Sequence, residues 1–256
     1  MEKINLLKSI FVISFAVFIV AFFQKDRLPD KNDIVQELYQ EPLQVPTEAA
    51  PITIQQKGVR YTITPLYEYQ LYGLVVSCHH SSSFDDYYHR EWGDFINTKD
   101  VCVIWGDNIE SEIYKKLKFS SGSWTCYVNF SSQNAQEALS KFKNTCLSNN
   151  HLLAANKDVS RTIMRMDRGD QVAFKGYLVN YDKDNIKSFR TTSTNRQDHG
   201  CEVVYVTEAT ILKKANAFWR FLFQLTKYMM IVVLLLLIAA YVRNVGKAGL
   251  EIKDAV

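Results

Sequence analysis

The chain has 256 residues and a mass of 29.6 kDa, enough for one ordinary domain with appendages. Hydrophobic residues make up 47% and charged residues 22%, which excludes a wholly disordered chain. A net charge of +3 is too small to indicate nucleic-acid binding by itself, and five cysteines are too few for a disulfide-rich scaffold.

The first predicted element is a membrane helix. Residues 10–23 read IFVISFAVFIVAFF without a charge, and a short basic tail, residues 1–8, precedes the helix. The apolar run reaches 18 residues when it is counted from Leu6, close to the roughly 20 that cross a bilayer. A cleaved signal peptide needs small residues before the cut site, and no A-x-A pattern follows the run. We therefore predict an uncleaved signal anchor over residues 9–23.

Residues 24–51 contain four of the five prolines. Proline fixes φ and removes a backbone donor, so this composition predicts an extended tether, with one short helix over Asp33 to Gln40. The folded domain is then expected over residues 52–212.

The pattern of this domain predicts an α+β, β-rich fold. Runs of β-branched and aromatic residues predict strands over residues 52–56, 59–64, 66–77, 100–105, 123–130, 169–181 and 202–212. Helical spacing predicts helices over 133–146 and 158–166. Within the strand 169–181, Gly176 indicates a bulge or a close backbone approach. The strand GDQVAFKGYLV followed by a late strand resembles small barrels of the OB type.

A polar segment over residues 78–91, CHHSSSFDDYYHRE, holds the best candidate ligands. Its potential metal-ligating or binding residues are His79, His80, Asp85, Asp86, His89 and Glu91. Adjacent histidines on a strand point to opposite faces, so only one of His79 and His80 can join a given site. The alternative is a plain polar loop between strands, which the Ser-Ser-Ser stretch favours. The sequence contains no cofactor-binding motif, so no cofactor is expected.

A second polar stretch contains Asn149, Asn150 and His151. We expect these residues on a loop, either as a ligand-binding site with His151 as a general base or as a simple Asx-type turn.

Five cysteines leave an odd one, and one disulfide is a possibility for which the sequence does not choose the pair. Cys102 and Cys126 lie in apolar strands and are more simply small core residues. Cys201 follows His199 closely, which raises the alternative of an activated thiol.

A second membrane helix is predicted over residues 221–242, between a membrane-proximal segment, 213–220, and a C-terminal tail, 243–256. Met229 to Val242 reads MMIVVLLLLIAAYV, which leaves no solvent-facing side. Helical spacing from Ala215 to Lys227 predicts a helix continuous with this span.

Two spans place both termini in one compartment. The basic residues that flank the spans are nearly equal in number on the two sides. The signal-anchor layout favours cytoplasmic termini and an exoplasmic central domain. Residues 24–216 contain 23 Lys and Arg and 24 Asp and Glu, a net charge of −1, so nucleic acid is not an expected partner.

Five segments together resemble a group of uncharacterised bacterial membrane-anchored envelope proteins. They are YGLVVS (72–77), CVIWGDN (102–108), GSWTC (122–126), LSNNHLL (147–153) and GDQVAFKGYLV (169–179). The resemblance implies a bacterial source and a central region that is a domain and not a linker. Together with the two predicted spans and the signal-anchor layout, it gives the expectation of a two-pass protein of the bacterial inner membrane with a periplasmic domain. The expected function is a non-catalytic binding or assembly component of an envelope complex, with other membrane or envelope proteins as partners. The alternative is a hydrolase or metalloenzyme that uses the loop 78–91 with His151.

Overall fold

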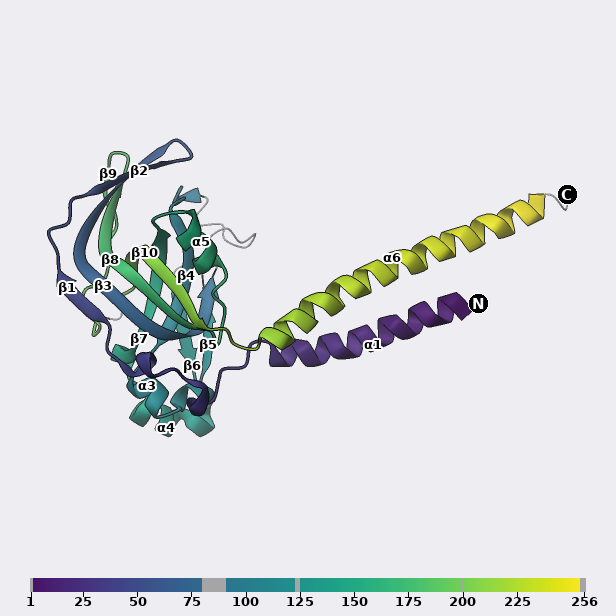
Figure 1. Ribbon diagram of the computed structural model, residues 1–256, viewed down its shortest axis with the longest axis horizontal. Coiled ribbons are helices and arrows are strands. Elements are labelled where there is room, and N and C mark those ends of the chain that lie inside the picture. The colour runs from purple at the N-terminus through teal and green to yellow at the C-terminus, as the bar shows by residue number, and fades with distance from the viewer. Residues whose placement is uncertain (1, 80–90, 123–124, 199, 254–256) are drawn as a thin grey trace. The chain divides into compact units, whose positions relative to one another are not determined.

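The computed structural model describes residues 2–79, 91–122, 125–198 and 200–253. The chain is an α+β protein with a mixed β-sheet and two long apolar terminal helices (Figure 1). It divides into a helical unit, residues 1–27 with 216–256, and a globular unit, residues 28–215.

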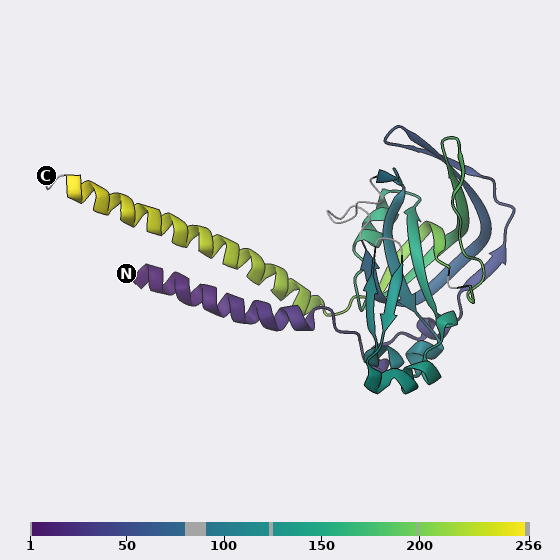
Figure 2. The same ribbon diagram turned by 180° about the vertical axis from the view of Figure 1, so that it is seen from behind.

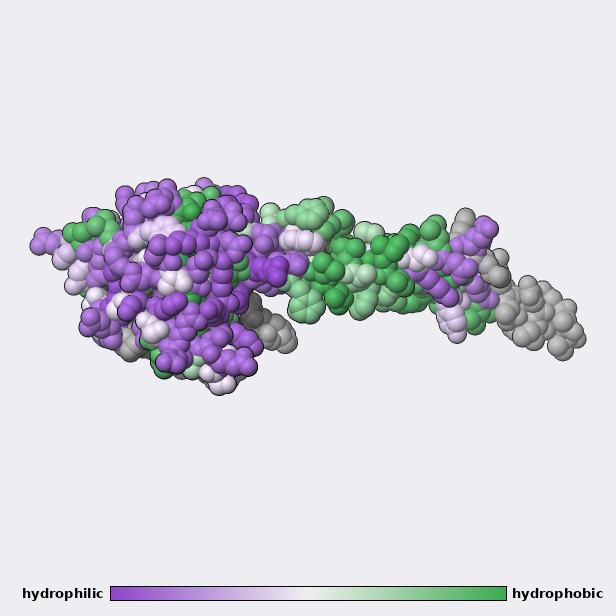
Figure 3. All heavy atoms as spheres, turned by 90° about the horizontal axis from the view of Figure 1, so that it is seen from below, coloured by the Kyte–Doolittle hydropathy of each residue, from purple (hydrophilic) through white to green (hydrophobic). Residues whose placement is uncertain are grey.

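The helical unit consists of α1 (Glu2–Gln24) and α6 (Ala217–Lys253). Their segments Ile4–Gln24 and Ala217–Val245 are long and apolar enough to cross a membrane. Hydrophobic residues cover this pair on the face shown in Figure 3. The predicted continuity of the membrane-proximal helix with the second span is confirmed, because α6 is unbroken from Ala217.

The two helices contact each other along one stripe of each. In α1 the covered positions recur every three or four residues, and Ser14 and Ala21 are buried there. Thr226 and Val233 are buried on the facing side of α6, and the ring of Phe18 stacks on Phe223 with centroids 4.8 Å apart. This spacing and these small residues are typical of helices that associate within a membrane.

The globular unit contains an eight-stranded mixed sheet and a two-stranded sheet, with short helices in the connections between strands (Figures 1 and 2). The large sheet consists of β1 (Leu43–Pro46), β2 (Ile52–Gln56), β3 (Val59–His79), β4 (Asn97–Ile104), β7 (Leu147–Ala154), β8 (Gln171–Lys183), β9 (Ile186–Arg190) and β10 (Glu202–Lys213). The small sheet pairs β5 (Lys118–Ser121) with β6 (Cys126–Asn129). The α-helices of this unit are α3 (Asp107–Glu110), α4 (Ala135–Lys141) and α5 (Lys157–Met164). The 3-10 helices are η1 (Lys31–Asp33), η2 (Gln36–Tyr39), η3 (Ile113–Lys116), η4 (Ser132–Asn134) and η5 (Asn144–Cys146).

The strand β3 organises the large sheet. It pairs with β8 from Tyr61 to Leu74 and with β4 from Leu74 to His79. The pairings β3–β4, β4–β7, β7–β10, β10–β8 and β8–β3 therefore return to their starting strand. The pair β7–β10 is parallel and the other four are antiparallel. Sequence patterning split β3 at Pro65, but the strand continues through a register shift between Pro65 and Tyr67, since a bulge accommodates a residue that cannot donate.

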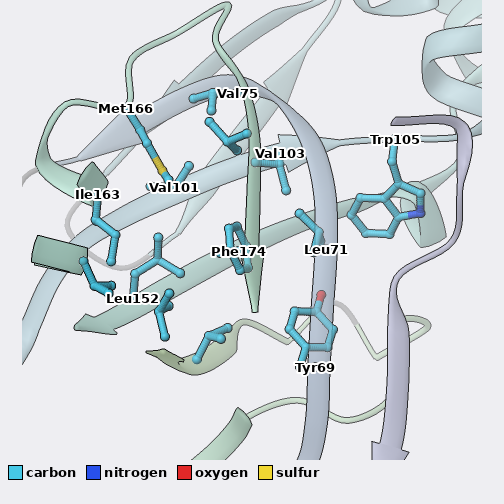
Figure 4. Packing of buried hydrophobic residues seen from close by; sticks show 14 of the residues in the cluster. Tyr69, Leu71, Val75, Val101, Val103, Trp105, Leu152, Ile163, Met166 and Phe174 are labelled. Atoms are coloured by element: carbon cyan, nitrogen blue, oxygen red, sulfur yellow. The ribbon is translucent and has the colours of Figure 1, made fainter. Parts of the chain in front are cut away.

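Three hydrophobic clusters hold the unit together. The first lies between the strands of this circuit, where Leu71, Val101, Leu152, Phe174 and other residues converge (Figure 4). The helix α5 contributes Val159 and Ile163 to it. The second cluster joins β3 and β4 to the segment 105–146, and the third surrounds Tyr61, Tyr181 and Tyr205.

Residues 28–51 belong to the globular unit, where an extended tether was expected. The side chain of Leu38 is fully buried in the second cluster, and β1 pairs with β3. The backbone N–H of Val35 donates to Gln171 at 2.7 Å. Burial of Leu38 and strand pairing outweigh the extended preference of the prolines, and the expected short helix appears as two 3-10 turns, η1 and η2.

Candidate functional site

The strand β7 carries the candidate residues Asn149, Asn150 and His151, all of them buried. The prediction that they lie on a loop is wrong. Four consecutive polar residues hide the strand alternation, yet β7 pairs with β4 on one side and β10 on the other. Leu152 joins the first cluster and Leu153 the third. His151 therefore lies on the outer face of the circuit, and Asn150 faces its interior.

His151 forms an ion pair with Asp100 of β4. Its Nδ1 lies 2.6 Å from Asp100 Oδ1, and the two side chains are only 2% and 1% exposed. The Asn97 amide donates to the same carboxylate oxygen at 2.8 Å. Burial lowers the pKa of His151, but the charge and hydrogen bond of Asp100, with a hydrogen bond to Cys201, outweigh it and raise this pKa to about 9. The imidazole is therefore protonated at neutral pH.

A second buried carboxylate is connected to this pair through Arg190 of β9. The guanidinium Nη2 lies 3.4 Å from His151 Nδ1, and Nε lies 3.6 Å from Asp94 Oδ2. The hydroxyl of Tyr181 donates to the Asp94 carboxylate at 2.8 Å. Burial, and then the charge of Asp94, raise the pKa of Tyr181 well above its ordinary value. We call Asp94, Asp100, His151 and Arg190 the buried charge network.

Cys201 contacts the network immediately before β10. The Asn149 amide donates to Cys201 Sγ at 3.4 Å, and a side-chain hydrogen bond joins Cys201 to His151. Cys201 is half-buried and is not part of a disulfide. The thiol of Cys201 thus contacts the imidazole of His151, which in turn contacts the carboxylate of Asp100. Asp100 and Cys201 are 101 positions apart in the sequence.

The residue His79 aligns with the network across the sheet. It is the register partner of Asp100, which is in turn the register partner of His151. Of the other predicted ligands of the loop 78–91, Glu91 is exposed, and His80, Asp85, Asp86 and His89 lie outside the described residues. Among the described residues, no group of three or more His, Cys, Asp or Glu side chains has a geometry that could hold a metal ion.

A groove of about 950 Å³ opens beside Asp94 and Asn97. Its walls are the β2 strand with the following turn, the segment 94–98 and the beginning of α5. The Tyr61 hydroxyl holds the beginning of the segment 94–98 in place, because its Oη accepts from the Phe95 N–H at 3.1 Å and donates to Gly93 O. The Gln56 amide donates to Phe95 O at 2.7 Å, so the hairpin wall is attached to the floor.

The interior of the strand circuit contains a separate polar cluster. The Ser148 hydroxyl donates to the Glu202 carboxylate, and both side chains are buried near Tyr69. Burial raises the pKa of Glu202 to about 7, although the Ser148 hydrogen bond acts in the opposite direction. Sequence reasoning placed none of these residues in a site.

Comparisons with known proteins add no relative: no protein family, no curated protein and no solved structure matches the chain. The resemblance to bacterial envelope proteins therefore stays an expectation. The residues that sequence reasoning missed are Asp94, Asp100, Arg190 and Cys201 in its contact with His151. The sequence did contain one signal for Asp100. This residue begins the apolar run DVCVIW, and a carboxylate in a buried central strand needs a polar partner.

Proposed function

We propose that the protein is a membrane-anchored, non-catalytic binding or assembly component of a bacterial envelope complex. The observation that carries this proposal is the open groove of about 950 Å³, whose floor segment is held by hydrogen bonds to Tyr61 and Tyr181. Its volume lies at the upper end of the range of about 300–1,000 Å³ that ligand sites occupy. We infer that an extended segment of a partner membrane or envelope protein binds there.

The chemistry of the groove supports recognition. Ile52, Ile54 and Tyr205 offer apolar surface, whereas the exposed Lys57 and Lys157 add positive charge to the walls. A site with apolar walls and a few fixed polar groups binds a segment through burial and reads its polar atoms for specificity. Asp94 is held by Tyr181 and Arg190, so the floor is already ordered before a partner arrives.

We further propose that the strand circuit is a small OB-like barrel. Support comes from its five pairings, from the single parallel pair β7–β10, and from α5 between β7 and β8. Such barrels bind ligands on the outer face of their second and third strands and on adjacent loops. By order along the chain these strands are β4 and β7, which carry Asp100 and His151.

We propose that the two apolar helices anchor the chain as a two-pass inner-membrane protein with a periplasmic domain. The disulfide Cys102–Cys126 supports this orientation, because structural disulfides persist in oxidising compartments. Alkaline phosphatase fused after Lys214 is expected to be active, and the same enzyme fused after Val256 inactive. The reverse result would overturn the orientation.

Photo-crosslinking tests the groove. Benzoylphenylalanine at Lys57, on the groove wall, is expected to capture a discrete partner in intact cells. The matched control is Leu139, which is exposed on α4 outside the groove. Equal capture at both positions, or none at Lys57, would remove the support for this binding site.

A hydrolase or metalloenzyme is the second candidate, and the cross-strand alignment of His79, Asp100 and His151 favours it. The protonated state of His151 opposes it, because an imidazolium cannot remove a proton from water. Metal analysis of the full chain, purified without chelators, distinguishes the two. One tightly bound metal ion per chain that is lost in His79→Ala would support the metalloenzyme.

A further inference from the structure

The strand β2 forms an open edge of the large sheet beside the groove. It pairs with β3 from Ile52 to Gln56, and among the described residues no other strand pairs with it. The unpaired edge of a strand presents N–H and C=O groups to which an extended chain can bind as a further strand.

The turn between β2 and β3 determines which backbone groups of β2 face outward. Gln56 and Val59 flank the turn, and the two residues between them have φ values of 49° and 82°, as in a type I′ hairpin. In such a hairpin the flanking residues are hydrogen-bonded to each other, and hydrogen-bonded and non-hydrogen-bonded pairs then alternate along the two strands. The N–H and C=O groups of Thr53 and Gln55 therefore point away from β3.

The hydrogen bonds of β3 support this alternation. Arg60 is the register partner of Gln55. Its N–H donates to Asp184 Oδ1 at 2.9 Å, and its C=O accepts from the Asp184 N–H at 2.7 Å. Because the backbone of Arg60 bonds on the side away from β2, Arg60 and Gln55 form a non-hydrogen-bonded pair.

The groove of about 950 Å³ lies along this open edge. Thr53, whose backbone groups point outward, lines the groove between the half-buried Ile52 and Ile54. A strand added to β2 would continue the sheet, and its alternate side chains would project over the groove. The backbone of such a segment would satisfy the open edge, and its apolar side chains would cover the two isoleucines.

The charges of the groove favour an acidic segment. The charged residues that line it are Lys57, Asp94 and Lys157. Asp94 is only 2% exposed, and Tyr181 and Arg190 hold its carboxylate. Both lysines are exposed, so a bound segment meets positive charge.

We propose that the partner segment is acidic and binds as a strand added to the open edge of β2. This inference rests on the proposed function of the groove, and it specifies the conformation and the charge of the ligand. The outward backbone groups of Thr53 and Gln55 pair with the segment. A carboxylate of the segment lies near Lys57, at the end of β2.

A designed peptide tests the charge on the full chain in detergent micelles. The probe is acetyl-TETVTVTET-amide, whose sequence reads the same in both directions and so suits a parallel or an antiparallel strand. Isothermal titration calorimetry measures its affinity. We expect a Kd below about 1 mM, and binding at least about tenfold weaker for the lysine counterpart TKTVTVTKT. Equal affinities, or no binding of the acidic peptide at about 1 mM, would overturn the proposal.

Methylation of the peptide backbone tests the conformation. The N–H groups of an added strand point alternately toward β2 and away from it. One peptide is methylated on the nitrogens of both valines, and the other on the nitrogens of the third and seventh residues, which have the opposite parity. One of the two should bind at least about tenfold more weakly than the parent, and the other within about threefold of it. Equal losses, or no loss in either, would refute strand addition.

Variants of the chain test the same contacts from the protein side. Thr53→Pro removes an outward N–H that β3 does not use, whereas Thr53→Val keeps it. We expect only Thr53→Pro to weaken binding of the acidic peptide, by at least about tenfold. Lys57→Gln should also weaken this binding, whereas Lys118→Gln, at an exposed position of β5 outside the groove, should not. Equal effects within either pair of variants would count against the proposal.

The photo-crosslink at Lys57 separates a failure of this inference from a failure of the binding site. A discrete partner that is captured equally well in Thr53→Pro would leave the groove as a binding site but refute strand addition. Absence of capture in the wild-type background would overturn both. A crosslinked product with the mass of two chains would identify a second copy of this chain as the occupant, which would overturn the assignment to a separate acidic partner.

Discussion

The backbone of Gly176 in β8 lies so close to the carbonyl oxygen of Tyr205 in β10 that a Cβ atom on Gly176 would sit 1.9 Å from that oxygen. The φ of Gly176 lies outside the left-handed region, so its backbone is not strained. The close approach gives a different reason for glycine, since β10 shifts register between Val206 and Glu208 beside it.

We predict that Gly176→Ala destabilises the globular unit by at least about 2 kcal/mol, because backbone of either β8 or β10 must move to admit the methyl group. The measurement is a urea melt of the full chain in micelles. Lys175→Ala, at the exposed neighbouring position, is the control and should stay within about 0.5 kcal/mol of wild type. A Gly176→Ala midpoint equal to the control would show that the strands separate freely at this position.

The disulfide between Cys102 and Cys126 is expected to stabilise the attachment of the β5–β6 sheet. It closes a loop with a sequence separation of 24 residues, for which chain entropy gives about 3 kcal/mol. Cys126→Ser should lower the free energy of unfolding by about this amount. Reductant should lower the melting temperature of wild type but leave that of Cys126→Ser unchanged, and equal effects on both would argue against the bond.

The stacking of Phe18 on Phe223 predicts a crosslink between α1 and α6. We expect the double variant Phe18→Cys, Phe223→Cys to form a disulfide in membranes, detected after cleavage at a protease site inserted in the globular unit. Phe15, which is 51% exposed, provides the control, because its cysteine faces away from α6. A crosslink from position 15 as efficient as that from position 18 would contradict the helix pairing.

Sequence patterns predicted those elements whose cause is local. The apolar runs that form α1 and α6, and the β-branched runs that form β2, β8 and β10, all appeared where expected. The strands β1 and β7 did not, because their stabilisation comes from distant partners. Leu43–Pro46 pairs with β3, and β7 is held between β4 and β10. The strand β1 has only four residues, and β7 contains a polar run, so neither shows a periodicity from which this pairing could be predicted.

The candidate site was predicted only in part, for a related reason. His151 was recognised as a residue capable of chemistry, but its partners come from β4, β9 and the segment before β10. Asp100, Arg190 and Cys201 are brought to it by tertiary pairing, which a single sequence does not encode as a local motif. The sequence suggested His199, two positions before Cys201, as the imidazole beside this thiol. The structure shows Cys201 in contact with His151, which is 50 positions away.

Glu202 is expected to make stability depend on pH below neutrality. Its pKa is about 7 in the folded chain against an ordinary value of 4.5, so the folded state binds more protons between these values. The contribution of Glu202 to the free energy of unfolding is therefore largest below pH 4.5 and falls as the pH rises to 7, by roughly 3 kcal/mol at most. Glu202→Gln should flatten this slope, whereas the exposed Glu208→Gln should keep it. The measurement is a series of urea melts across this pH range. Equal slopes of unfolding free energy against pH for wild type, Glu202→Gln and Glu208→Gln would contradict the role of Glu202.

The ion pair of His151 and Asp100 predicts a second pH range, above that of Glu202, in which the free energy of unfolding changes. The pKa of His151 is about 9 in the folded chain against 6.5 ordinarily, because Asp100 outweighs the opposing effect of burial. A raised folded pKa contributes stability that is fully present below pH 6.5 and is lost as the pH rises through 9. Asp100→Asn and His151→Gln should each destabilise by about 3–5 kcal/mol, since each leaves one buried charge without its partner. The double variant should cost less than the sum of the two, because it removes both charges together. It should also lose the fall in unfolding free energy between pH 6.5 and 9 that wild type shows. Additive single effects, or a double variant with the wild-type slope, would mean that the two side chains titrate independently despite their 2.6 Å separation.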